Sequence, residues 1–286
     1  CHCVIALSLR HCVVIASLHC HFIILSFISY SVISEDLLAN NYLSLLQEGS
    51  TLRYEHWNLE RKEVTGYSNF LQIYQNEEKQ WLEQNANTKP DGEVFTRKQL
   101  IFTDDGEIGQ YTEEDLRDIY QVSTTYQGLT SKSVLNRSGE IRSFEQKLEK
   151  DTVPLELIML HMRLLMPELL KDKEVKFPIY ASMLALELEE QGLPQSLSQL
   201  EMIAEPIKKR NYSAPWGAQE ALQVDLYPAS WTVRALLPAE KSRFRFVIAT
   251  STPYLILEFE EGKTRHTLLE WDNGDSKMID EIKPLF

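Results

Sequence analysis

Residues 224–262 read VDLYPASWTVRALLPAEKSRFRFVIATSTPYLILEFEEG, and this stretch decides the fold. Apolar side chains return at every second position, which is the period of a β-strand with one buried face. The residues predicted to face inward are Val224 and Leu226, then Trp231, Val233 and Ala235, then Phe244, Phe246 and Ile248, and last Leu255, Leu257 and Phe259. Turn sequences separate these runs at Pro238, Thr252-Pro253 and Glu261-Gly262. Short strands joined by tight turns predict an antiparallel meander with one buried face.

Similar runs precede this stretch. TLRYEHWNLE (51–60), VTGYSNFLQIYQ (64–75), EVFTRKQLIF (93–102) and YQVSTTYQ (120–127) are rich in aromatic and β-branched residues, as strands are. Residues 131–148 are typical of a hairpin that turns at Ser138-Gly139. Two segments stay open. Residues 175–194 fit a strand followed by either a strand or a helix, and residues 196–210 fit a short helix or a strand.

One segment predicts a helix strongly, over residues 152–171. Asp151 or Thr152 can cap it, Pro154 suits its first turn, and LELIMLHMRLLMPELLK follows. A helix with so few polar positions is buried on more than one side, and Pro167 should kink it or begin a second piece. We therefore predict an α+β fold. It is a curved antiparallel sheet, a half-barrel-like meander, with one main helix on its concave face.

The first 34 residues differ from the rest of the chain. They hold all four cysteines and four of the seven histidines, but the ligand types adjoin one another without turn residues, which disfavours a zinc site. The apolar run 22–33 is shorter than a membrane span. It fits a secretion signal better, with Val32-Ile33-Ser34 resembling a signal-peptidase site. We predict that residues 1–34 are a signal-like or mis-called extension outside the fold, and that residues 35–286 form a single β-rich domain.

Net charge and cysteine content limit the partner and the compartment that we expect for this protein. The chain carries a net charge of −13, which disfavours nucleic acid as a partner. A chain without cysteine after residue 34 suits an exported protein, because no free thiol is left to oxidise. The signal-like segment and the absence of cysteine after it both fit an exported protein.

Familiar catalytic and cofactor motifs are absent from the sequence. G-x-S-x-G, G-x-G-x-x-G, the P-loop motif and H-E-x-x-H do not occur, so neither an enzyme nor a cofactor is predicted. The acidic segments 103–115 and 272–281 fail the spacing of a calcium loop, and no metal site is expected. One enzymatic alternative remains, a hydrolase-type site built from scattered residues such as His161 and Glu168.

Aromatic and methionine side chains supply candidates for an apolar binding site. A curved sheet that faces a Met- and Leu-rich helix can form an adaptable cleft, because methionine side chains adjust their shape easily. The residues that we expect to line it are Tyr54, Trp57, Phe95, Met159, His161, Met162, Met166 and Trp231.

A resemblance supports the same class of protein. The block 224–262 contains P-x-S-W, then a strand rich in aromatics and a closing strand that ends Glu-Gly. With LMPELLKDKEVKFPIYAS (165–182), it resembles uncharacterised exported bacterial proteins near domain-of-unknown-function family 3108. The resemblance covers about half of the chain and rests on structural motifs. It implies an exported β-rich domain of the bacterial periplasm or outer membrane, related in form to the half-barrels of lipoprotein carriers. It assigns no functional residue.

These observations together predict a non-enzymatic envelope protein that binds an apolar small molecule or a lipid in the concave face of its sheet. An envelope protein partner is a further possibility. The alternatives are a structural or interaction protein without a ligand, and the hydrolase described above. An open cleft would favour the first, a fully packed interior the second, and a perturbed His161 beside carboxylates the third.

Overall fold

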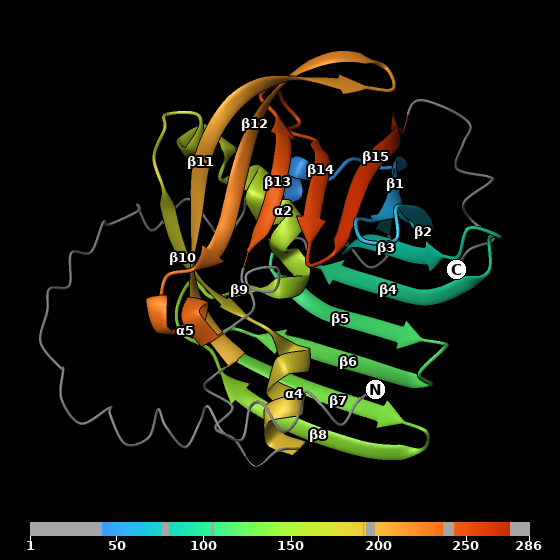
Figure 1. Ribbon diagram of the computed structural model, residues 1–286. Helices are drawn as coiled ribbons and strands as arrows, with labels where there is room; N and C mark the ends of the chain where they lie inside the picture. Colours follow the sequence, from blue (N-terminus) through green and yellow to red (C-terminus); the bar gives the residue numbers. More distant parts are fainter. Residues whose placement is uncertain are drawn as a thin grey trace, which may run out of the picture. The chain divides into compact units, whose positions relative to one another are not determined.

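The computed structural model describes residues 42–75, 80–103, 106–190, 192, 198–236 and 243–274, and every structural statement below concerns them. They belong to one compact unit that runs from Leu38 to Phe286. The predicted leader over residues 1–34 and its boundary with the body lie outside the described residues, so both stay predictions. Within the unit, a large curved sheet is the main structural element (Figure 1).

The first half of the sheet is a series of hairpins in which each strand pairs antiparallel with the next. Its strands are β1 (Ser50–Asn58), β2 (Glu63–Gln75), β3 (Gln80–Thr88), β4 (Val94–Phe102), β5 (Ile108–Asp115), β6 (Tyr120–Gln127), β7 (Thr130–Arg137) and β8 (Glu140–Lys147). The hairpin predicted at Ser138-Gly139 is confirmed. Both residues have positive φ, 53° and 90°, as a two-residue type I′ turn requires.

The second half of the sheet begins at a very short strand. Its strands are β9 (Val153–Pro154), β10 (Val175–Tyr180), β11 (Gln199–Ala214), β12 (Gly217–Pro228), β13 (Phe244–Ala249), β14 (Ile256–Glu261) and β15 (Thr264–Asn273). β9 and β10 are parallel, and the other neighbours are antiparallel. The predicted meander is therefore confirmed from β10 to β15.

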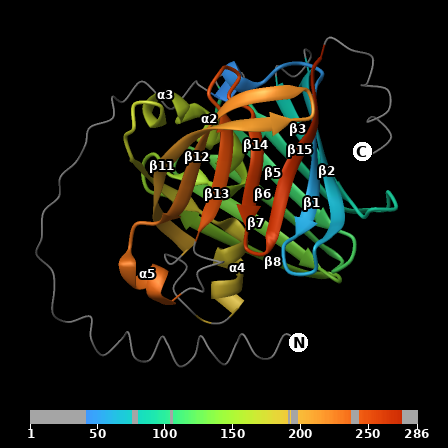
Figure 2. The ribbon, with the colours of Figure 1, turned by 45° about the horizontal axis from the view of Figure 1, so that its top comes forward.

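The two halves are joined because β1 pairs with β15. The order of strands then begins at β8 and ends at β9, which follow each other directly in the chain. The sheet curls toward a barrel that stays open between these two strands (Figure 2). At the opening, the Gln199 side chain accepts a hydrogen bond from the Glu149 amide at 3.0 Å and donates one to the Lys147 carbonyl at 3.1 Å.

Short helices accompany the sheet. They are η1 (Tyr42–Leu45), η2 (Leu155–Leu157), α2 (Ile158–Leu164), α3 (Met166–Leu169), α4 (Ser182–Glu190) and α5 (Trp231–Leu236). The helix predicted over residues 152–171 exists as η2, α2 and α3, and Pro167 lies in the first turn of α3, as expected for a residue that begins a new piece. α2 lies inside the curve of the sheet (Figure 1), where Leu160 and Met162 share one core with Val224 and Phe246.

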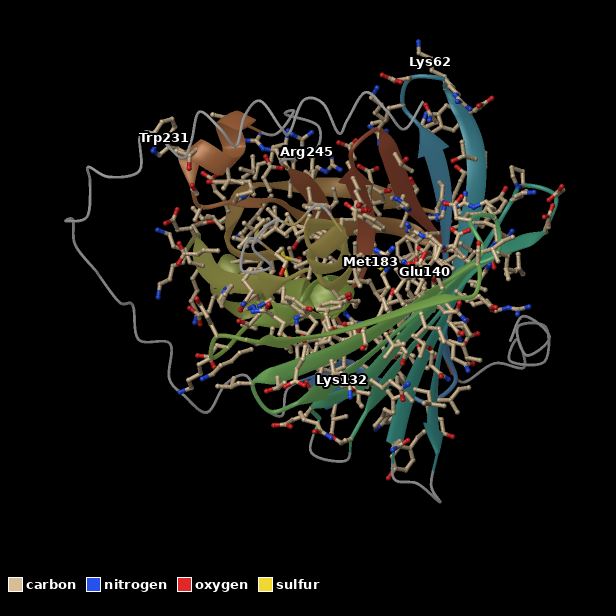
Figure 3. The ribbon with its side chains drawn as sticks, turned by 90° about the horizontal axis from the view of Figure 1, so that it is seen from below. Lys62, Lys132, Glu140, Met183, Trp231 and Arg245 are labelled. Carbon is tan, nitrogen blue, oxygen red and sulfur yellow. The ribbon has the colours of Figure 1, made fainter. Side chains whose placement is uncertain are left out.

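One predicted strand is wrong. The run Trp231, Val233 and Ala235 was expected to alternate inward, but these residues form the short helix α5. The Ser230 hydroxyl accepts a hydrogen bond from the Val233 amide at 3.4 Å, as the cap of a helix does. Trp231 is 72% exposed and projects away from the sheet (Figure 3).

The segments left open are assigned, and three strands are added, one of which is the two-residue β9 inside the predicted helix 152–171. Residues 175–180 form a strand that is followed by the helix α4, and residues 199–210 lie in β11. No strand was predicted over residues 80–88 or 108–115, where β3 and β5 lie. Their sequences hide the usual pattern, since polar side chains such as Glu83 and Asn85 are buried.

Candidate functional site

A small cavity lies between α2 and the concave face of β1–β3. The side chains that line it are Leu52, Tyr54, Phe70, Glu83, Met159, Leu160, Arg163, Leu255 and Ile256. It offers about 20 Å³ to the centre of a water molecule, which is room for about one water. Its wall is mostly apolar but includes one acidic and one basic side chain.

The acidic member, Glu83, is held by a relay of amide groups. The side-chain nitrogen of Gln72 donates a hydrogen bond to Oε2 of Glu83 at 2.8 Å. The side-chain oxygen of Gln72 accepts a hydrogen bond from the backbone N–H of Gln47 at 3.0 Å. Burial raises the pKa of Glu83, while the Gln72 hydrogen bond and the nearby charge of Arg163 lower it to a smaller degree. Burial therefore favours the neutral acid at this position.

The basic member, Arg163, comes from α2 and is only 7% exposed. Its Nε donates to the Pro253 carbonyl at 3.1 Å, and its Nη2 donates to the Leu45 carbonyl at 3.3 Å. Among the described residues, no carboxylate lies within 4.0 Å of its guanidinium group. Burial lowers the pKa of Arg163, and the charge of Glu83 acts in the opposite direction.

Tyr54 and its aromatic neighbours fix the wall of the cavity that β1 supplies. The Tyr54 hydroxyl donates to the Ile256 carbonyl at 2.9 Å, which ties β1 to the start of β14. Its ring meets Phe70 edge-on at 5.7 Å and Phe259 at 5.8 Å between centroids. These contacts leave Tyr54 in one orientation, with its ring against the cavity.

The structure brings two of the eight predicted site residues, Tyr54 and Met159, into this cavity. The others lie elsewhere. His161, Met162 and Met166 are enclosed in the main core. Trp57 is half-buried on β1, and Phe95 of β4 lies under the guanidinium group of Arg117. Trp231 is on the surface. Whether the eight residues contact a ligand stays a prediction.

His161 is a core residue in an apolar environment. Its Nδ1 lies 2.9 Å from the Tyr42 hydroxyl, its ring lies 4.4 Å from that of Phe177, and its buried Nε2 has no partner among the described residues. Burial lowers the pKa of His161 to about 3. Glu168, proposed above as a catalytic partner, instead pairs on the surface with Lys171 at 2.5 Å and Lys173 at 3.7 Å.

Two further carboxylates on the concave side were missed in the sequence. Glu113 accepts hydrogen bonds from Tyr111 and Tyr120 and forms an ion pair with Lys98 at 3.3 Å. Glu156 accepts a hydrogen bond from Ser182 at 2.5 Å. Both carboxylates have partners, which points to a role in positioning the strands and α4. The sequence feature that could have identified Glu113 is its inward position in β5, and for Glu156 it is the position at the start of the helical segment.

His56 and His266 form a second polar cluster, with their rings 4.4 Å apart. His56 Nε2 lies 2.6 Å from the Ser68 hydroxyl, and that hydroxyl donates to the Asn87 side chain at 2.5 Å. Because the single hydroxyl proton is directed to Asn87, His56 must donate to Ser68 and cannot act as its base. The geometry of this Ser–His pair therefore gives no activated nucleophile.

The described residues contain neither a cluster of potential metal ligands nor a helix that could span a membrane. No group of three or more potential metal ligands comes together in this part of the chain. No helix in the same residues is long and apolar enough to cross a membrane.

Comparison with known proteins finds similarity at the level of three-dimensional structure only. No family model matches the chain and no curated protein matches it, so the resemblance to family 3108 is not confirmed. A β-barrel-like protein of domain of unknown function 1849 from Brucella abortus is 8% identical, with a TM-score of 0.48 over 79% of this chain and 98% of its own.

Two further solved structures are similar. A candidate lipoprotein from Parabacteroides distasonis is 9% identical, with a TM-score of 0.32 over 80% of this chain and 98% of its own. A candidate exported protein with a YmcC-like fold from Bacteroides fragilis is 9% identical, with a TM-score of 0.33 over 79% of this chain and 97% of its own. These values are too low to support an inference about activity or ligand.

Proposed function

We propose that this protein is an exported, non-enzymatic protein of the bacterial envelope that binds an apolar ligand, such as a lipid acyl chain, between α2 and β1–β3. The observation that carries the proposal is the cavity itself. Its wall combines apolar side chains from several strands with Met159 of the central helix, and two buried charged groups, Glu83 and Arg163, also face it. Apolar cavities with a few converging polar groups are the usual form of a ligand site.

Export is supported by the sequence. The apolar stretch Phe22–Phe27 precedes Val32-Ile33-Ser34, which resembles a signal-peptidase site, and these residues lie outside the described part of the chain. The absence of cysteine after residue 34 fits an oxidising compartment.

The arrangement of polar groups supports binding rather than catalysis. A Ser–His hydrolase needs a histidine that accepts the proton of its serine, and the Ser68 hydroxyl donates to Asn87 instead. His161 contacts Tyr42 and Phe177, with no carboxylate within 4.0 Å among the described residues.

An acyl chain does not fit the cavity as it stands, because the free space is about the size of one water molecule. Entry requires a shift of Met159, whose unbranched side chain can adopt many shapes at low cost. It also requires loosening of the contacts that hold α2, which are the Arg163 bonds to the Leu45 and Pro253 carbonyls. The proposal therefore includes a second, open position of α2.

Native mass spectrometry of the full chain, secreted by a bacterial host and purified without detergent, tests this function. We expect a discrete adduct that organic solvent removes and that is identified as a lipid. Met159→Trp should fill the cavity and remove the adduct. Met183→Trp is the matched control, because Met183 is a half-buried methionine of α4 that does not line the cavity. A clean apo mass that no added lipid changes would refute the proposal.

A second candidate function is an interaction protein of the envelope that has no ligand. The closed interior favours it, because His161, Met162 and Met166 are at most 1% exposed. A permanently packed core is what a structural protein needs. In the same experiment, this candidate predicts an apo mass for the wild type and for both variants.

A further inference from the structure

Arg163 carries a positive charge in the core that no described residue balances by direct contact. Its two hydrogen bonds reach neutral carbonyl groups, and its Nη1 makes no hydrogen bond to a described residue. Removing a charged group from water is costly unless an opposite charge compensates it. Since Arg163 also lines the cavity, a bound anion could supply that compensation.

We propose that the cavity selects ligands that end in an anionic group, namely fatty acids, and that Arg163 binds their carboxylate. This inference rests on the proposed function, because it names the chemical class of the apolar ligand. The planar guanidinium group binds carboxylates through parallel hydrogen bonds, and its Nη1 is free for one of them. The acyl chain would follow the apolar side chains of Leu52, Phe70 and Met159.

Glu83 lies on the strand wall of the same cavity and opposes a bound anion when it is ionised. It has a neutral hydrogen-bond donor, Gln72, and no ion pair within 4.0 Å among the described residues. Burial raises the pKa of Glu83, which weakens this opposition, and the fraction of Glu83 that stays ionised competes with a bound anion for Arg163. Glu83 therefore acts as a residue that tunes the affinity of Arg163 for anions.

The size of the head group decides between classes of lipid. Either head group needs more room than the one water that the cavity now admits, but a carboxylate needs a smaller opening than a phosphodiester with its glycerol. We therefore expect free fatty acids to bind more tightly than phospholipids.

The test measures the affinity of the delipidated full chain for hexadecanoate, hexadecanol and dipalmitoylphosphatidylglycerol by displacement of a fluorescent fatty acid. We expect hexadecanoate to bind at least about tenfold more tightly than the alcohol, which has the same chain without the charge. Arg163→Met should remove this difference, and Arg163→Lys should restore part of it. Arg245→Met is the control, because Arg245 pairs with Asp225 and Glu260 and does not line the cavity.

Glu83→Gln provides an independent test if Arg163→Met fails to fold. The amide keeps the shape of the acid and removes its charge, so hexadecanoate should bind more tightly and hexadecanol equally well. Equal binding of acid and alcohol to the wild type would overturn the inference and leave the proposed function in place. Tighter binding of the phospholipid would overturn the choice of fatty acid. Failure of all three probes to bind would overturn the proposed function itself.

Discussion

The hydroxyl of Tyr42 lies 2.9 Å from Nδ1 of His161, and this contact joins η1, ahead of the first strand, to the middle of α2. Both side chains are buried, and the two rings are tilted against each other at 6.2 Å. Two contacts thus tie the helix inside the sheet to η1, one from Tyr42 to His161 and one from Arg163 to the Leu45 carbonyl.

Tyr42→Phe should destabilise the fold by about 1–3 kcal/mol, because it leaves a buried imidazole without its hydrogen bond. Urea denaturation at pH 7 measures the change. Tyr74→Phe serves as the control, since the Tyr74 hydroxyl makes no hydrogen bond to a described residue and its ring packs on Trp81 in either form. Equal stability of both variants and the wild type would show that the Tyr42 contact contributes nothing.

Stability should fall as the pH drops below 6.5, because three histidines are buried in their neutral form. Burial lowers the pKa of His161 and of His266 to about 3 and that of His56 to about 4. Below pH 6.5 the unfolded chain binds protons that the folded chain does not, and each such histidine costs about 1.4 kcal/mol per pH unit. The raised pKa of Glu83 acts in the opposite direction, since the folded state takes up that proton more readily.

His161→Phe isolates one of these contributions. Between pH 6.5 and pH 4.5, the free energy of unfolding of the variant should fall by about 1.4 kcal/mol less per pH unit than that of the wild type. This difference in slope does not depend on the stability of the variant at pH 7. Denaturation curves at five pH values give both slopes. Identical slopes would mean that His161 is protonated in the folded state, contrary to its apolar surroundings.

Two residues predicted to bind ligand should differ sharply when truncated. Met162→Ala removes a fully buried side chain from the core and should cost about 2–5 kcal/mol. Trp231→Ala removes a side chain that is mostly in solvent, so a change within about 0.5 kcal/mol is expected. Thermal and urea unfolding of both variants measure the two changes in the free energy of unfolding. A large loss of stability for Trp231→Ala would mean that Trp231 makes a contact that the structure does not show.

The turn between β5 and β6 contains a residue that is poorly suited to its conformation. Ile119 has φ of +48° and is 67% exposed, and a β-branched residue in the left-handed region is strained by about 1–2 kcal/mol. Ile119→Asn should therefore stabilise the fold by up to about 1 kcal/mol. Ile141→Asn is the matched control, because Ile141 is equally exposed but lies in the regular strand β8. Stabilisation by both variants, or by neither, would contradict the role of backbone strain.

The fold was predictable from the sequence where burial follows a simple period. The alternation from Phe244 to Ile248 and the Ser138-Gly139 turn led directly to β13 and to the β7–β8 hairpin. It was not predictable in β3, because Glu83 and Asn85 are polar residues on the inside. At Trp231 the spacing of the apolar residues matches a strand, and the cap from Ser230 decides for a helix instead.

The cavity was only partly predictable. Tyr54 and Met159 were named because aromatic and methionine side chains suit an apolar ligand. Glu83 and Arg163 were not named, because they line the same cavity only through the curvature of the sheet around α2. That curvature depends on long-range pairing, such as that of β1 with β15, which no local pattern reveals.

Methyl NMR of the full chain with labelled methionines tests the central claim most directly. Six methionines provide six probes, and one of them, Met159, lines the cavity. Titration with dodecanoate should shift the Met159 methyl signal most, in a saturable manner, with smaller changes at Met162 and Met166. A titration that leaves Met159 unchanged, or that moves only the signals of Met183, Met202 or Met278, would contradict a ligand site between α2 and β1–β3.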